Sequence, residues 1–115
     1  MKPPLRGEVW LVDLGLGLAA KVRPALVISV PLTDQDRALV AIVPHTTSLR
    51  GTRFEANCSV SFLKAGAFDA QGVVTVPLAK LMRPLGTLKP ADLANVEARL
   101  REWLGLASPS REAGA

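Results

Sequence analysis

Two uninterrupted apolar runs constrain the fold of this chain more than any other feature of its sequence. They are RPALVISV at 23–30 and ALVAIVP at 38–44, and the segment PLTDQDR between them has the composition of a turn or short loop. A short continuous apolar run bounded by turn signals is typical of a strand that is buried on both faces. We therefore expect a sheet with packed side chains on both of its sides.

Two more segments favour strands, and one favours a loop. RGEVWLVDL at 6–14 is rich in β-forming residues, with apolar side chains on both faces of the expected strand. GVVTVPLAKLM at 72–82 predicts an edge strand, because Pro77 has no N–H group to donate to a ladder. LGLGLAAK at 14–21 carries two glycines and no helical period, which predicts a mobile loop between the first two strands.

The clearest alternation of apolar and polar residues is in TRFEANCSVSF at 52–62. It predicts one long, half-buried strand with its polar face in solvent. The inward positions are Phe54, Ala56, Cys58, Val60 and Phe62, and the outward positions are Arg53, Glu55, Asn57, Ser59 and Ser61. This pattern makes the single cysteine a core residue rather than a reactive thiol.

The last segment, PADLANVEARLREWLGL, changes to a helical period. Pro90 suits the first turn, Gly105 suits the stop, and Glu97 and Arg101 have the spacing of a pair on one helix face. The apolar stripe is expected to pack on the sheet, and its members are Leu93, Val96, Leu100, Trp103 and Leu104. Strands followed by one amphipathic helix predict a small barrel capped by a helix, in a single domain over 1–106 with a flexible tail over 107–115.

Composition excludes several classes of function. One cysteine and one histidine allow neither an internal disulfide nor a structural metal site, and the carboxylates are too scattered for a metal cluster. No apolar stretch approaches the ~20 residues of a membrane span, and the start does not resemble a signal peptide, so we expect a cytoplasmic protein with no membrane contact. The net charge of +4 leans towards anionic partners, and an aromatic content of 4% argues against an aromatic base-stacking platform.

A cluster of hydroxyl groups follows the second apolar run. The stretch VPHTTSLRG at 43–51 holds the only histidine of the chain together with two threonines and a serine. Such clusters commonly form polar turns, and an arginine at the start of a strand, as Arg23 is here, commonly makes a surface ion pair. The alternative is that Arg23 and the hydroxyl groups face each other in a site for an anionic group.

The order of these motifs resembles that of the MazF/PemK family of bacterial toxins, the toxin halves of type II toxin–antitoxin pairs. The opening strand RGEVWLVDL, the run RPALVIS, the strand ending VPHTTS and the closing RPLGTLKPADLANVEARLREWLGL carry the resemblance, which extends over nearly the whole chain. It implies a mainly β (α+β) fold, an SH3-like barrel of five to seven strands with a C-terminal amphipathic helix. It further implies a homodimer, a cognate acidic antitoxin, and a sequence-specific endoribonuclease that cleaves single-stranded RNA with no metal or other cofactor.

The resemblance also assigns residues. It makes Arg23, the arginine before the proline of the second strand, catalytic, and a threonine just past the third strand its partner; Thr47 fits that spacing best, with Thr46 one step away. A guanidinium offers a fixed fork of donors to a phosphate, and a hydroxyl adds a positioned hydrogen bond. Further residues expected to contact RNA are Lys21, His45, Thr46, Ser48, Arg50 and Lys80.

The chain departs from the family pattern in places, and other readings stay open. The loop GLGLAAK is short and lacks the common glycine-serine-glutamate element, so the role of that glutamate is not carried over. His45 is either a general base or a simple turn residue, and Lys80 is either an RNA backbone contact or a solvated side chain. The alternatives to an RNase are a gyrase poison of the same fold and a non-catalytic barrel that only binds its partner, and neither of these needs Arg23 and Thr47.

Overall fold

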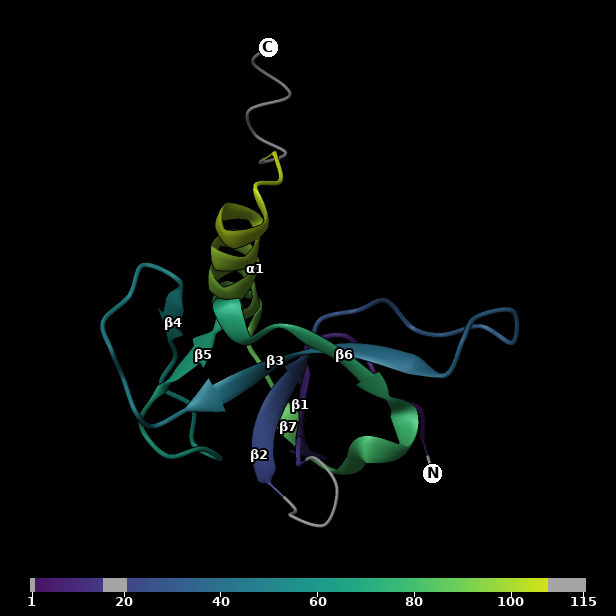
Figure 1. Cartoon of the computed structure of the whole chain (residues 1–115). Coiled ribbons are helices and arrows are strands. Elements are labelled where there is room, and N and C mark those ends of the chain that lie inside the picture. Colours follow the sequence, from purple (N-terminus) through teal and green to yellow (C-terminus); the bar gives the residue numbers. More distant parts are fainter. Residues whose placement is uncertain (1, 16–20, 108–115) are drawn as a thin grey trace.

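Seven strands and one α-helix make up the computed structural model, which describes residues 2–15 and 21–107 (Figure 1). Five of the strands come before the first of two short 3-10 helices. The elements in chain order are β1 (Glu8–Asp13), β2 (Val22–Val27), β3 (Leu39–Thr46), β4 (Glu55–Asn57), β5 (Ala67–Asp69), η1 (Ala70–Gly72), β6 (Val74–Pro77), η2 (Leu78–Lys80), β7 (Leu81–Thr87) and α1 (Pro90–Leu104).

The strands form one antiparallel sheet in the order β4-β5-β3-β2-β1-β7, with β6 paired to β3 off this path. The predicted class, mainly β with a C-terminal helix, is confirmed. Within the described ranges, no ladder joins the two ends of the sheet, so the sheet is open and not a hydrogen-bonded barrel. β3 lies at the centre because it pairs with β2, β5 and β6 along different parts of its length.

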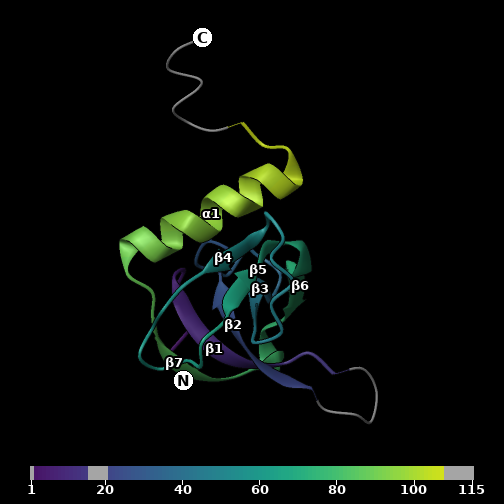
Figure 2. The same ribbon diagram turned by 90° about the vertical axis from the view of Figure 1, so that its left-hand side faces the viewer.

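Both faces of the central strands are buried, as the apolar runs predict. In β2, Ala25 and Val27 point into one core cluster, with Trp10 of β1, while Leu26 between them points into the other. The second cluster also contains the buried side chains of α1, which packs against β4 and η1 on one side of the sheet (Figure 2). The first residue of β2 is exposed, whereas the end of β3 pairs with β5.

The helix begins and ends where the sequence predicts, but its apolar stripe is buried over only part of its length. Pro90 occupies the first turn, and Gly105 ends the helix in the left-handed conformation at φ 70°. Val96 is fully buried, whereas Trp103 is 41% exposed and packs its indole edge-on against the ring of Phe54. Leu104, 52% exposed, also departs from the expected packing. The expected partner of Glu97 was wrong too, since this carboxylate pairs with Arg6.

The long strand predicted over 52–62 is wrong. Only three residues form β4, and the chain then leaves the sheet until β5, which the sequence did not reveal. The late start of β4 follows from Glu55, an expected outward position whose buried carboxylate accepts hydrogen bonds from the backbone N–H groups of Arg50, Gly51 and Thr52. These bonds fold the preceding segment into a tight turn, and they lower the pKa of Glu55, the bond from Arg50 most of all. Cys58 is buried as expected.

The predicted strand over 72–82 is two strands. Pro77 ends β6, whose only partner in the described sheet is β3, so its assignment to an edge is confirmed. The 3-10 helix η2 then turns the chain, and β7 continues to Thr87 along β1. No helix in the described parts is long and apolar enough to cross a membrane. Residues 16–20 of the predicted loop and 108–115 of the predicted tail lie outside the described residues.

Candidate functional site

Arg23 is the second residue of β2, near the solvent-exposed end of that strand. Ala25 lies opposite Pro44 in the β2–β3 ladder, and the same register continued by two residues sets Arg23 opposite Thr46. Because residues directly opposite each other in a ladder share a face, the guanidinium and the Thr46 hydroxyl group belong to the same side of the sheet. Thr47 follows the end of β3, in a bend of the chain.

Two adjoining pockets open at this end of the sheet. The first, here the wide pocket, has a volume of about 500 Å³. The second, the narrow pocket, has about 260 Å³. Lys21, Arg23 and His45 line both pockets, so they form the ridge between them. The wide pocket is further lined by Val22, Pro24, Thr47, Phe62, Leu63, Lys64 and Leu85. The narrow pocket is further lined by Leu14, Pro44, Thr46 and Asp69.

His45 lies in β3 rather than in a turn, and it is the most deeply buried side chain of the ridge. Its side chain is 4% exposed and its ring packs edge-on against Phe68, with the ring centroids 5.1 Å apart. Burial lowers its pKa, which keeps the imidazole neutral at neutral pH. Gly66 lies so close that a Cβ atom there would come within 2.8 Å of the imidazole Cε1. The Nε2 atom has no hydrogen-bond partner among the described residues.

The hydroxyl cluster divides between the two pockets. Thr46 lines the narrow pocket, and its Oγ1 accepts a hydrogen bond of 3.0 Å from the backbone N–H of Ser48, which leaves the hydroxyl proton free to donate. Thr47 is exposed and lines the wide pocket. The structure therefore places Arg23 with Thr46 in the narrow pocket and with Thr47 in the wide pocket.

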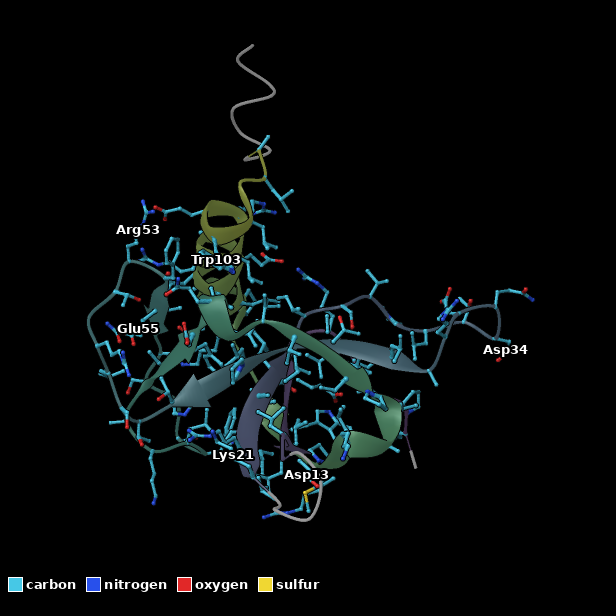
Figure 3. The ribbon with its side chains drawn as sticks, in the orientation of Figure 1. Asp13, Lys21, Asp34, Arg53, Glu55 and Trp103 are labelled. Atoms are coloured by element: carbon cyan, nitrogen blue, oxygen red, sulfur yellow. The ribbon has the colours of Figure 1, made fainter. Side chains whose placement is uncertain are left out.

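Three residues predicted to contact RNA line neither pocket. Ser48 follows β3, and its backbone N–H binds the Thr46 hydroxyl oxygen. The backbone N–H of Arg50 binds the Glu55 carboxylate. Lys80 lies in η2 near Asp13, whose pKa is lowered by the backbone N–H groups of Gly15 and Lys21 and, to a smaller extent, by the charge of Lys80. Figure 3 shows Asp13 and Lys21 at the same end of the molecule, and Glu55 away from it near β4 and β5.

The sequence did not reveal Lys64 and Asp69 as parts of the site. Lys64 comes from the segment between β4 and β5, which was mistaken in part for a strand, and Asp69 was one of several scattered carboxylates. Phe62, expected in the core, packs partly buried against the core cluster that α1 covers and also lines the wide pocket. No local pattern marks these residues, because only the pairing of β5 with β3 brings them to the ridge.

The charges of the site are suited to an anionic ligand. Lys21, Arg23 and Lys64 have no carboxylate within ion-pair distance in the part of the chain that the structure describes, where the pairs found are Arg6–Glu97 and Arg53–Glu102. Cations next to hydroxyl donors are suited to bind a phosphate group. The described residues contain no group of three or more histidine, cysteine, aspartate or glutamate side chains that would hold a metal ion.

Comparison with known proteins identifies related molecules. Residues 5–104 match the family model of the PemK-like, MazF-like toxin of type II toxin–antitoxin systems. The endoribonuclease MazF1 of Mycobacterium bovis is 30% identical over 109 residues, which cover 95% of this chain and 100% of that protein. A mycobacterial endoribonuclease solved in complex with its cognate antitoxin superposes with a TM-score of 0.75 at 29% identity, covering 95% of this chain and 100% of the other. MazF from Deinococcus radiodurans, at 22% identity, has the same fold, with a TM-score of 0.79 over 92% of this chain and 100% of that one.

Proposed function

Since the chain belongs to the PemK-like, MazF-like toxin family of type II toxin–antitoxin systems, we propose that it is an endoribonuclease that cleaves single-stranded RNA without a metal ion and so arrests growth. The observation that supports this function best is the ridge, where Arg23 lies beside two threonines and two lysines whose charges are not paired within the described chain. The similarity to proteins named endoribonucleases favours it over a gyrase poison or a barrel that only binds a partner.

RNA supplies its own nucleophile in the proposed reaction. The ribose 2′-oxygen forms a bond to the adjacent phosphorus, the bond from phosphorus to the 5′-oxygen breaks, and a 2′,3′-cyclic phosphate and a 5′-hydroxyl result. The proton lost from the 2′-hydroxyl is balanced by the proton that the leaving 5′-oxygen gains. The protein therefore needs only to align the sugar and phosphate and to stabilise the charge of the phosphorane. Arg23 serves this purpose because its planar fork of donors fits two phosphate oxygens at once.

One of the two threonines donates the second hydrogen bond in this proposal. Thr47 is the residue that the sequence favours by its spacing, and it lines the wide pocket. The β2–β3 register supports Thr46, which shares a face with Arg23 and has a free hydroxyl proton. Removal of one such donor typically raises a barrier by ~2.7–4 kcal/mol, so single substitutions separate the two.

The function is tested with purified protein, a long RNA and EDTA, with the cuts mapped at nucleotide resolution. We expect defined cuts in EDTA, each leaving a cyclic phosphate. A substrate with a 2′-deoxy sugar at a mapped cut should resist cleavage there, because the nucleophile is absent. Cleavage of that deoxy substrate, or a requirement for added metal, would contradict the mechanism.

The partners follow from the same family membership. We propose a homodimer with the ridge near the two-fold interface, and an acidic antitoxin that covers the ridge and competes with RNA for it. The net charge of +4 and the toxin–antitoxin complexes among the similar structures support this. Light scattering at micromolar concentration should give twice the mass of 12.2 kDa, and saturating antitoxin should displace RNA. We also propose a single domain over 1–106, which the family match over 5–104 supports, in a protein of the cytoplasm.

A further inference from the structure

Asp69 is an unexpected residue in a pocket beside a phosphate site. Asp69 lines the narrow pocket with Arg23 and Thr46, and no other described aspartate or glutamate lines either pocket. A carboxylate repels a phosphate group, so this residue is not placed to bind the RNA backbone. It is suited to face a group that donates hydrogen bonds.

The Asp69 carboxylate retains acceptor capacity. Its Oδ1 accepts a hydrogen bond of 3.1 Å from the backbone N–H of Gln71, which caps η1 and fixes the orientation of the side chain. No cation of the described chain lies within 4.0 Å of it, and no hydrogen bond to Oδ2 is found there. The same pocket is lined by the buried His45, whose Nε2 also lacks a partner. The Oδ2 atom of Asp69 thus remains available to a ligand of this small pocket, whereas the His45 Nε2 is buried.

We propose that the narrow pocket binds one of the two nucleobases that flank the scissile phosphate, and that Asp69 selects guanine there. The proposal rests on the proposed function, because the phosphate held by Arg23 sets the position of the neighbouring bases. Guanine presents two adjacent donors, N1–H and the N2 amino group, to the two oxygens of one carboxylate. Uracil presents one N–H between two carbonyl oxygens, which the carboxylate repels.

The wide pocket differs from the narrow pocket in chemistry as well as size. Phe62, Leu63 and Leu85 provide apolar walls, and Lys64 and Thr47 provide donors, with no carboxylate among its lining residues. Apolar walls contact the face of any base, so contacts there tolerate sequence changes. The wide pocket therefore accepts the base on its side of the phosphate with little discrimination, and the narrow pocket selects the base on the other side.

The test uses Asp69→Asn, which keeps the helix cap because asparagine caps as well as aspartate does. The change replaces one acceptor oxygen with an amide donor that opposes the guanine N–H groups. Asp36→Asn is the matched control. Asp36 also binds a backbone N–H, that of Thr33, and loses the same charge, but it lies in an exposed loop that lines neither pocket.

Cleavage is measured on short RNAs that differ only at the two nucleotides flanking the cut. The wild-type protein and Asp36→Asn should prefer guanine over uracil at one of these positions by on the order of 10- to 100-fold. In Asp69→Asn this ratio should fall to about threefold or less, because guanine loses a paired acceptor and the carboxylate no longer repels uracil. Equal rates for guanine and uracil in the wild type, or an unchanged ratio in Asp69→Asn, would overturn the proposal. So would an equal loss on every substrate, which would assign Asp69 to the reaction itself.

A second measurement separates this proposal from the proposed function. The same oligonucleotides with a 2′-deoxy sugar at the cut are titrated against each protein, so that base preference is measured without cleavage. Guanine-dependent binding that requires Asp69, in a protein that cuts no RNA, would refute the nuclease and retain the pocket. Cleavage without any guanine preference in binding would refute the pocket and retain the nuclease.

Discussion

Two arginines that contact the helix, Arg6 and Arg53, have their charges paired with carboxylates, whereas, within the described chain, the basic side chains of the ridge do not. On the helix side, Arg6 forms an ion pair with Glu97 and Arg53 with Glu102, and Arg99 donates a hydrogen bond of 2.9 Å to the carbonyl of Arg53. On the ridge, Lys21 and Arg23 have no such partner within the described residues.

The unpaired charges are the ones that are available for a ligand. Surface ion pairs contribute ~0–1 kcal/mol each, so the helix-side pairs matter little for stability, but they neutralise charges that would otherwise attract RNA anywhere on the surface. An unpaired arginine loses no partner when a phosphate binds to it. The net charge of +4 is therefore less informative than the place where the unpaired cations gather.

Removal of one arginine from each side of the molecule tests whether paired and unpaired arginines differ in function. Arg23→Ala should lower the cleavage rate by at least ~10²-fold, because the phosphorane loses its fork of donors. Arg23→Lys should restore little, since an ammonium group keeps the charge without the planar fork. Rates are measured on one mapped RNA site under single-turnover conditions.

Arg53→Ala is the matched control for this prediction. It removes the same charge from a side chain that is 72% exposed and paired with Glu102, and its cleavage rate should stay within about twofold of wild type. An equal loss of cleavage rate in Arg53→Ala and Arg23→Ala would show that the paired and unpaired arginines do not differ in function.

The next largest effect comes from the hydroxyl groups of the two pockets. Thr46→Val should slow cleavage by on the order of 10²-fold, because it removes a donor that shares a face with Arg23 while keeping the shape of the side chain. Thr47→Val should cost about tenfold or less. Both rates are measured on the mapped site, with circular dichroism to check the fold of Thr46→Val, which also loses its bond to Ser48. The reverse order would assign the catalytic hydroxyl to Thr47, as its spacing in the sequence suggests.

A smaller effect, on stability alone, is expected at Glu55, the buried carboxylate whose acceptors are all used within the fold. Glu55→Gln should lower the thermal midpoint at pH 7, since an amide accepts fewer of the backbone hydrogen bonds. The folded protein lowers the pKa of Glu55, so the advantage of wild type is present above the ordinary value of 4.5 and is lost as the pH falls through the folded pKa. Thermal melts of both proteins from pH 7 down to pH 3 should therefore converge. A constant difference across this range would mean that the ionised form of Glu55 is not what stabilises the turn.

The parts of this fold that could be predicted are those whose signals are local. The continuous runs of β2 and β3 indicate burial on both faces by themselves, and the α1 boundaries follow from Pro90 and Gly105. The division of the segment from β4 to β7 into short strands could not be predicted, because these strands depend on partners distant in sequence. Glu55 is an example. The alternation of apolar and polar residues predicts that its side chain lies in solvent, whereas its carboxylate binds the backbone N–H groups of the turn over 50–52.

The residues of the site also divide into those that could be predicted from local signals and those that could not. Arg23, Lys21 and the threonines were predicted because they flank the two apolar strands in an order that resembles a known family. Lys64 and Asp69 were not predicted, since they reach the ridge only when β5 pairs with the end of β3. A pocket built from one local motif and one tertiary contact can therefore be only half predicted from sequence.

Substitutions on the ridge should leave the rate at which a thiol reagent labels Cys58 unchanged. Burial, with a contribution from the Asp92 charge, raises the pKa of this thiol to about 11, and the side chain lies in the core cluster that α1 covers. At pH 8 the thiolate fraction is on the order of one in a thousand, so a thiol reagent should modify Cys58 only when the helix side opens.

Because the ridge contributes little to the packing of α1, Arg23→Ala and Asp69→Asn should be labelled as slowly as wild type. Leu100→Ala supplies the contrast, since it leaves a cavity under α1 at a cost of ~2–5 kcal/mol and should speed labelling clearly. Faster labelling in Arg23→Ala would show that the ridge and the helix side are coupled, and its loss of cleavage would then reflect a loosened fold rather than a missing phosphate contact.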